Sequence, residues 1–142
     1  RRRRRPVDSP RGPTPPPPGE GRPWVPAGPP ACQPGQCYTY PDLGATTLGM
    51  MVARVTGQGL DVFLHERVFA PLGMVNTFFK PADSVKSRVA PTEVSPPRGY
   101  PLQGEVHDEN AYALGGVAGH AGLFSTASDL SIFAQMILGG GE

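Results

Sequence analysis

The sequence has few of the residues that mark several common classes of protein. Its 142 residues include only two lysines, two cysteines and one tryptophan. No apolar run approaches the roughly 20 residues of a transmembrane helix, and the arginines at its start are not followed by the apolar segment of a signal peptide. Cys32 and Cys37 have no second cysteine pair and no nearby histidine, which argues against a zinc site. A disulfide between them is an open alternative, but we expect two free thiols.

Two familiar serine nucleophile motifs are also missing. None of the seven serines has a lysine three residues later, and none has glycine two residues away on both sides. The first absence removes the Ser-x-x-Lys motif, and the second removes the Gly-x-Ser-x-Gly elbow. The sequence therefore offers no recognisable serine nucleophile.

Residues 1–30 differ in composition from the rest of the chain. They contain seven arginines, eleven prolines, four glycines and one alanine, with almost no apolar side chains. Because such a segment cannot offset the entropy of ordering, we predict that it is disordered. Its arginines would suit an anionic partner and its prolines a polyproline II ligand. A linker without function, or a shifted reading frame in GC-rich DNA, explains the same composition.

Residues 31–142 are the part of the chain that can fold, and they begin with two predicted helices. Basic and acidic residues are mixed there, without the clustered positive charge of a nucleic-acid-binding surface. Apolar residues recur with a helical period over about Leu43–Val55 and again over about Leu60–Phe69. We expect Asp42 to cap the first helix and Pro71 to stop the second.

A long segment without a regular period follows, from about Pro71 to Tyr112, and it is rich in proline and glycine. After the glycine-rich run Gly115–Ala127, a third helix is predicted, with Ser125 or Thr126 as its cap. The buried stripe of this helix is predicted to comprise Leu130, Phe133, Ala134 and Ile137. Because we find no set of alternating strands, we expect the helices to leave apolar faces without a partner.

Several polar side chains are candidates for a site. His65 and Glu66 begin like the zinc motif His-Glu-x-x-His, but the second histidine is missing, so we interpret them as a solvated helix surface. His107 and Asp108 are adjacent, and with His120 they offer two imidazoles and a carboxylate for a divalent metal. We favour a different interpretation, in which His107 and Asp108 form a hydrogen-bonded loop beside a substrate pocket. No metal site and no cofactor are predicted.

Two longer segments carry a family resemblance. They read PGQCYTYPDLGATTLGMMVARVTGQGLDVFLHERVFAPLGMVNTFF and LQGEVHDENAYALGGVAGHAGLFSTASDLSIFAQMILGGG. Together, and in this order, they strongly resemble the penicillin-binding protein and serine β-lactamase superfamily, above all its β-lactamase-related esterase and low-molecular-weight penicillin-binding branch. The resemblance covers about Pro34–Gly141.

The resemblance implies an α+β fold, in which an antiparallel sheet with flanking helices joins an all-helical domain and the active site lies between them. On this interpretation residues 31–142 form a partial β-lactamase-related domain. The chain would be mostly α, with the helical region and long loops but without most of the catalytic sheet.

The same resemblance assigns roles to two residues. The family uses a serine nucleophile in Ser-x-x-Lys, a tyrosine in Tyr-x-Asn or Tyr-Ser-Asp, and a Lys- or His-x-Gly motif on a late strand. Tyr40 falls on the motif tyrosine and Asp42 on its Asn/Asp, while Pro41 stands where the family usually has serine. His120 begins a His-Ala-Gly triplet, but it lies in a block that precedes a helix, so we do not assign it to the third motif.

We therefore expect a fragment of a β-lactamase-like serine hydrolase that is inactive alone. The complete family member would act on an ester, an amide, a β-lactam or a peptidoglycan peptide. For such proteins the bacterial periplasm, the cell envelope or secretion is usual. The alternative is a non-enzymatic helical interaction module with a basic, proline-rich tail that binds acidic partners or SH3-like domains. A metalloenzyme centred on His107 and His120 is a more distant alternative.

Overall fold

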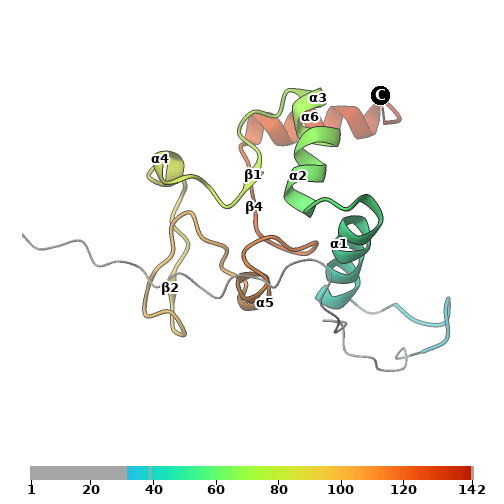
Figure 1. Ribbon diagram of the computed structural model, residues 1–142, viewed down its shortest axis with the longest axis horizontal. Coiled ribbons are helices and arrows are strands. Elements are labelled where there is room, and N and C mark those ends of the chain that lie inside the picture. Colours follow the sequence, from blue (N-terminus) through green and yellow to red (C-terminus); the bar gives the residue numbers. More distant parts are fainter. Residues whose placement is uncertain (1–31, 39, 142) are drawn as a thin grey trace, which may run out of the picture.

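The computed structural model describes residues 32–38 and 40–141 (Figure 1). The predicted disorder of residues 1–30 lies outside the described residues. Among those described, no helix has the length and apolar character needed to cross a membrane. In chain order, the elements are α1 (Asp42–Thr56), α2 (Leu60–Leu64), the π-helical turn η1 (His65–Phe69), α3 (Ala70–Leu72), β1 (Phe78–Phe79), α4 (Asp83–Lys86), β2 (Val94–Ser95), β3 (Tyr100–Pro101), α5 (Glu109–Ala113), β4 (Leu123–Phe124) and α6 (Ala127–Leu138).

Helix α1 begins one residue earlier than predicted. Pro41 occupies the N-cap position with an extended backbone, and no side-chain hydrogen bond caps the helix. The prediction that Asp42 is the cap is therefore wrong, because Asp42 is already the first helical residue. Its carboxylate instead lies in the first turn, where the positive end of the helix dipole favours a negative charge. Gly57 ends the helix in the left-handed conformation, with φ of 71°.

The second helical segment runs through Pro71 instead of stopping before it. In the π-helical turn the bonding pattern lengthens, so that the Ala70 N–H bonds to the carbonyl of His65, five residues back. Pro71 lies in the first turn of α3, directly after the π-helical turn, and has no N–H to continue the bonding pattern. Gly73 ends the run in the left-handed conformation, and the Met74 N–H donates a hydrogen bond to the Phe69 carbonyl at 2.8 Å.

The segment that was predicted to be a loop contains short regular elements. Strands β2 and β3 form an antiparallel hairpin with Val94 opposite Pro101, and α4 precedes it. Strands β1 and β4 pair across a much longer stretch of sequence, with Phe78 opposite Phe124. Figure 1 shows α1 and the β2–β3 hairpin on opposite sides of the molecule, with α5 between them. Strands of two residues are too short to produce the alternating pattern that reveals a strand in sequence.

A small apolar core lies around α5 and the glycine-rich run that follows it. Val106, Ala111 and Ala118 form its buried cluster, against which Tyr112 and Leu114 pack. Leu102, from the end of the hairpin, is fully buried. This core therefore holds together the part of the chain that approaches the start of α1.

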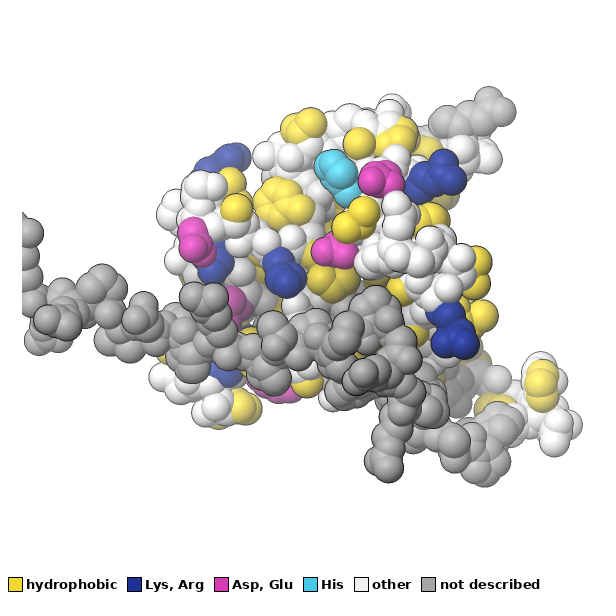
Figure 2. All heavy atoms as spheres, viewed as in Figure 1, with side chains coloured by type: hydrophobic (Ala, Val, Ile, Leu, Met, Phe, Trp, Pro, Cys, Tyr) yellow, Lys and Arg dark blue, Asp and Glu magenta, His cyan; other side chains and the backbone are white. Residues whose placement is uncertain are grey.

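The long helices present apolar faces to solvent. The predicted cap of α6 is confirmed, since the Thr126 hydroxyl accepts the Asp129 N–H at 3.3 Å. The predicted buried stripe of that helix is wrong. Of that stripe, Leu130 is 54% exposed and Ile137 is 59% exposed. Helix α1 likewise exposes apolar side chains, which reach the surface over it in Figure 2. In the described part of the chain, no sheet covers these faces.

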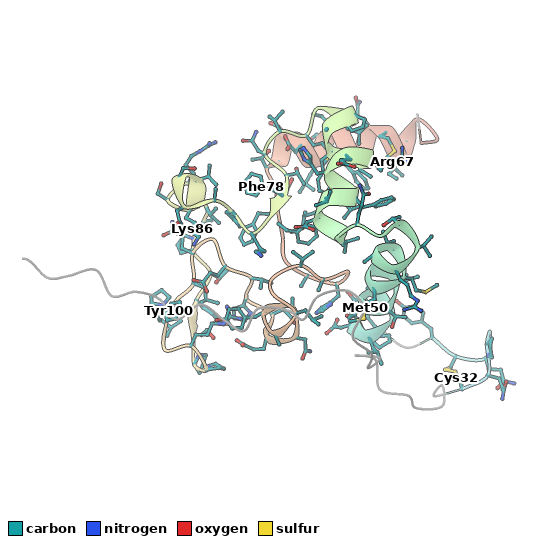
Figure 3. All side chains as sticks on the ribbon, in the orientation of Figure 1. Cys32, Met50, Arg67, Phe78, Lys86 and Tyr100 are labelled. Carbon is teal, nitrogen blue, oxygen red and sulfur yellow. A yellow bond between two sulfur atoms is a disulfide. The ribbon has the colours of Figure 1, made fainter. Side chains whose placement is uncertain are left out.

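The two cysteines form a disulfide, so the expectation of free thiols is wrong. Cys32 and Cys37 have Cα atoms 6.4 Å apart. The turn between them explains the pairing: the Gln36 N–H bonds to the Gln33 carbonyl at 3.1 Å, and Gly35 supplies a positive φ of 82°. The closed loop lies out beyond α1, where Figure 3 labels Cys32.

Candidate functional site

The residues matched to the family's second motif stand at the N-terminal end of α1. Tyr40 comes just before the helix and is 85% exposed, so its phenol faces solvent. Asp42 opens the helix and is also exposed. Pro41 between them removes one backbone N–H and fixes the chain direction into the first turn.

The glycine-rich run crosses α1 at very close range. A Cβ on Gly119 would collide with the carbonyl oxygen of Ala45, and a Cβ on Gly49 would lie 3.2 Å from the Gly119 backbone. Position 119 therefore requires glycine for the two segments to touch, and a side chain at position 49 would push them slightly apart. This crossing brings the residue after Gly119, which is His120, onto the first turns of α1.

His120 joins three segments of the chain through its ring. Its Nδ1 lies 2.8 Å from the hydroxyl of Thr46 on α1, and its Nε2 lies 3.0 Å from Oδ1 of Asp108. The Thr46 hydroxyl in turn donates to the Asp42 carbonyl at 2.8 Å. Only 6% of the His120 side chain is exposed. A continuous hydrogen-bonded chain thus runs from Asp108 through His120 to the start of α1.

Asp108 anchors the other end of this chain. It is the N-cap of α5, and its Oδ1 accepts the Ala111 N–H at 2.7 Å. That N–H holds the pKa of the Asp108 carboxyl below its usual range, and the His120 ring adds to the effect, although partial burial acts in the opposite direction. The carboxylate is therefore kept ionised by its hydrogen bonds.

Asp42, Asp108 and His120 form a compact group of potential metal ligands. One donor atom from each lies within 4.8 Å of the other two. His107 belongs to no such group among the described residues. Its Nε2 bonds to Glu93 at 2.8 Å, and its side chain is half exposed. His107 and Asp108, neighbours in sequence, bond to different partners, and their place beside a substrate pocket stays a prediction. Among the described residues, no group of three potential metal ligands contains both His107 and His120.

Arg98 fixes the hairpin against α5. Its Nη1 donates to the Val106 carbonyl at 2.6 Å, and its Nη2 lies 3.3 Å from Oε1 of Glu109. The guanidinium also lies 3.9 Å from the centre of the Tyr112 ring, which is a cation–π contact. Sequence reasoning singled out neither Arg98 nor Thr46, because neither belongs to a recognised motif.

A separate hollow of about 270 Å³ lies between α2, η1 and β1. His65 and Glu66 are exposed on its rim, which agrees with the interpretation of a solvated helix surface. Glu66 accepts a hydrogen bond from the Gln58 side chain at 3.0 Å. Phe69, Phe78 and Phe79 make much of its lining apolar. Neither Tyr40 nor Asp42 lines this hollow.

Comparison with known proteins connects the chain to enzymes of one family. It is 39% identical over 123 residues to a putative D-alanyl-D-alanine carboxypeptidase of Escherichia coli K12, covering 77% of this chain and 28% of the relative. It is 38% identical over 124 residues to an N-acetylmuramyl-L-alanine amidase of Bacillus subtilis 168, covering 78% of this chain and 28% of that protein. The chain therefore spans just over a quarter of the length of these curated relatives.

Solved structures show the same fold. A penicillin-binding protein homologue from Pyrococcus abyssi, described as octameric, matches with a TM-score of 0.55 and 19% identity, covering 79% of this chain and 24% of that one. A D-amino acid amidase from Ochrobactrum anthropi SV3 matches with a TM-score of 0.54 and 21% identity, covering 75% and 31%. The β-lactamase family model matches residues 12–142. On this match, the chain belongs to the β-lactamase family, within the superfamily of serine β-lactamases and penicillin-binding proteins.

Proposed function

We propose that this chain is the helical, second-motif part of a serine hydrolase that cleaves an amide or ester of the peptidoglycan type. The observation that carries the proposal is the family match over residues 12–142, within which Tyr40 and Asp42 stand at the exposed start of α1. The names of the relatives, a putative carboxypeptidase and an amidase, support hydrolysis of amide bonds. The class of substrate, and whether the cleaved bond is an amide or an ester, are part of this proposal.

In the proposed reaction, a serine oxygen attacks the carbonyl carbon of the substrate and loses its proton to a neighbouring base. The phenol of Tyr40 passes a proton to the leaving nitrogen or oxygen as the carbonyl–leaving-group bond breaks. Water then attacks the acyl-enzyme and releases the acid. Because the sequence has no Ser-x-x-Lys, we expect the serine and its lysine to come from outside these 142 residues.

Asp42 would orient the site rather than react. It lies in the first turn of α1, where the positive end of the helix dipole favours its negative charge. A serine at position 41 would offer a hydroxyl and a backbone N–H, and Pro41 has neither. Fewer hydrogen-bonding groups are therefore available to a substrate here. The hydrogen-bonded chain through Thr46 and His120 supports the turn from behind.

The chain by itself is expected to be inactive, and covalent labelling tests this directly. Incubation with a fluorescent penicillin or an activated ester should leave it unlabelled, because an acyl-enzyme needs the serine nucleophile. Stoichiometric labelling of the chain alone would contradict the proposal.

A chimera tests the role of Tyr40. Residues 32–141 would replace the matching segment of the Escherichia coli relative, and the labelling rate would be compared with that of the unmodified relative. Tyr40→Phe is expected to slow labelling of the chimera by about 10²- to 10⁴-fold, the usual contribution of a positioned acid or base. Tyr38→Phe is the matched control, because Tyr38 is 87% exposed, almost the same as Tyr40. Equal rates for the Tyr40→Phe chimera and its parent would refute the assignment.

A further inference from the structure

The group formed by Asp42, Asp108 and His120 has properties that the hydrolase proposal does not use. Its three side chains come from the start of α1, the N-cap of α5 and the glycine-rich run, and their donor atoms lie within 4.8 Å of one another. The group is graded in exposure: the His120 side chain is 6% exposed, that of Asp108 is 32% exposed, and Asp42 is open to solvent. An ion would therefore enter past Asp42 and meet a buried imidazole.

Both ring nitrogens of His120 have polar partners. Nδ1 lies 2.8 Å from the Thr46 hydroxyl, and Nε2 lies 3.0 Å from Oδ1 of the Asp108 carboxylate. The Thr46 hydroxyl donates to the Asp42 carbonyl at 2.8 Å, so its oxygen can accept an N–H from Nδ1. In that tautomer of the neutral ring, the lone pair of Nε2 faces the Asp108 carboxylate and is available to a metal ion.

From this geometry we propose that Asp42, Asp108 and His120 bind one divalent transition-metal ion of the Zn²⁺ type. Imidazole nitrogen and carboxylate oxygen are both zinc ligands, and three protein ligands leave a fourth position for water. A nitrogen donor in the group disfavours Mg²⁺ and Ca²⁺, which prefer oxygen ligands. Thr46 acts as the outer hydrogen-bond partner that orients the ligating imidazole. The inference stands on these contacts and does not rest on the hydrolase proposal.

The other two histidines serve as internal controls. His107 is paired with the single carboxylate of Glu93, and His65 belongs to no group of three donor atoms among the described residues. Both are more exposed than His120 and would bind a metal ion more readily if accessibility alone mattered. The proposal therefore predicts that binding follows the three-ligand geometry and not the exposure of the imidazole.

Calorimetric titration of the metal-free chain with Zn²⁺ alone tests the proposal. We expect one ion per chain, held by one donor atom from each of the three side chains. His120→Gln and Asp42→Asn should each weaken binding by about tenfold or more, and Thr46→Val should weaken it by about tenfold, the lower end for outer-shell partners. His107→Gln should leave the affinity unchanged.

Asp42→Asn keeps the test valid if the His120 variant fails to fold, because Asp42 is exposed and circular dichroism can check that its variant keeps its helices. Nitrogen NMR of the imidazole gives a second readout, in which the Nε2 signal of His120 should shift on addition of Zn²⁺. Equal affinity of the wild type and Asp42→Asn, or loss of binding in His107→Gln, would overturn the proposal. So would an Nε2 signal of His120 that does not move at saturating Zn²⁺. None of these measurements uses the labelling reaction, so the two proposals succeed or fail separately.

Discussion

Replacing Asp108 with alanine tests how strongly the hydrogen-bonded chain holds the fold together. The change removes the cap of α5, and a lost cap costs about 1 kcal/mol of unfolding free energy. It also leaves Nε2 of the buried His120 without a partner, which costs about 1–3 kcal/mol. Because Asp108 is 32% exposed, solvent screening places the sum towards the lower end of about 2–4 kcal/mol.

Asp108→Asn separates the effect of the two hydrogen-bond contacts from the effect of the negative charge. The Ala111 N–H and the His120 ring both meet the same atom, Oδ1, so an amide oxygen at that position keeps both contacts and loses only the charge. Asparagine is also a good N-cap residue. We expect this variant to lose about 1 kcal/mol or less, which is the difference between a charged and a neutral hydrogen bond.

Urea unfolding followed by far-ultraviolet circular dichroism measures both variants, at neutral pH and with EDTA to keep the chain free of metal. The expected order of stability is wild type, then Asn, then Ala, with the larger step between Asn and Ala. An alanine variant as stable as the wild type would show that the chain of hydrogen bonds contributes nothing to the fold. Equal losses for Asn and Ala would show that the charge, and not the two contacts through Oδ1, is what matters.

One further prediction concerns Asp108 and three concern other parts of the molecule. Because the pKa of Asp108 is depressed in the folded state, its contribution is complete above the ordinary value of 3.8 and is lost as the pH falls through the folded value, so the urea midpoints of wild type and Asp108→Asn should converge in acid. Gly119→Ala should cost about 1–3 kcal/mol in the same assay, because the new methyl group collides with the Ala45 carbonyl; an unchanged midpoint would contradict the close crossing. Ile137→Lys on the exposed face of α6 should change stability by no more than about 0.5 kcal/mol, and a large loss would mean that the face is covered. Cys32→Ser should leave the helical circular dichroism unchanged, since the disulfide closes a loop outside the helices.

The sequence predicted the long helices well because their apolar residues recur with the helical period over many turns. It also predicted that Ser125 or Thr126 caps α6, and the structure shows that Thr126 is the cap. It failed at Pro71, where a π-helical turn changes the bonding pattern so that a proline fits inside the helical run. It failed again for the four strands, because two-residue strands exist only through their pairing with distant or hairpin partners.

The candidate site also contains residues that the sequence revealed and residues that it did not. Tyr40 and Asp42 were identified from local sequence and family resemblance, and whether they act in catalysis stays a prediction. The sequence placed His107 and Asp108 in one hydrogen-bonded loop but did not reveal their partners: Asp108 caps α5 and bonds to His120, while His107 bonds to Glu93. Thr46 was missed because a half-buried helical threonine carries no signal until its partner is known.

By itself, the sequence determined the period of the helices, the position of α1 behind Tyr40 and the membership of the family, because each depends on residues close together or on an ordered set of matching segments. Only the tertiary structure decided what the apolar faces and polar side chains touch. The stripe of α6 has the pattern of a buried face, yet it is exposed here because burial depends on a partner surface and not on the pattern alone. His120 reaches Thr46 and Asp108 because two glycines let distant segments cross at backbone distance.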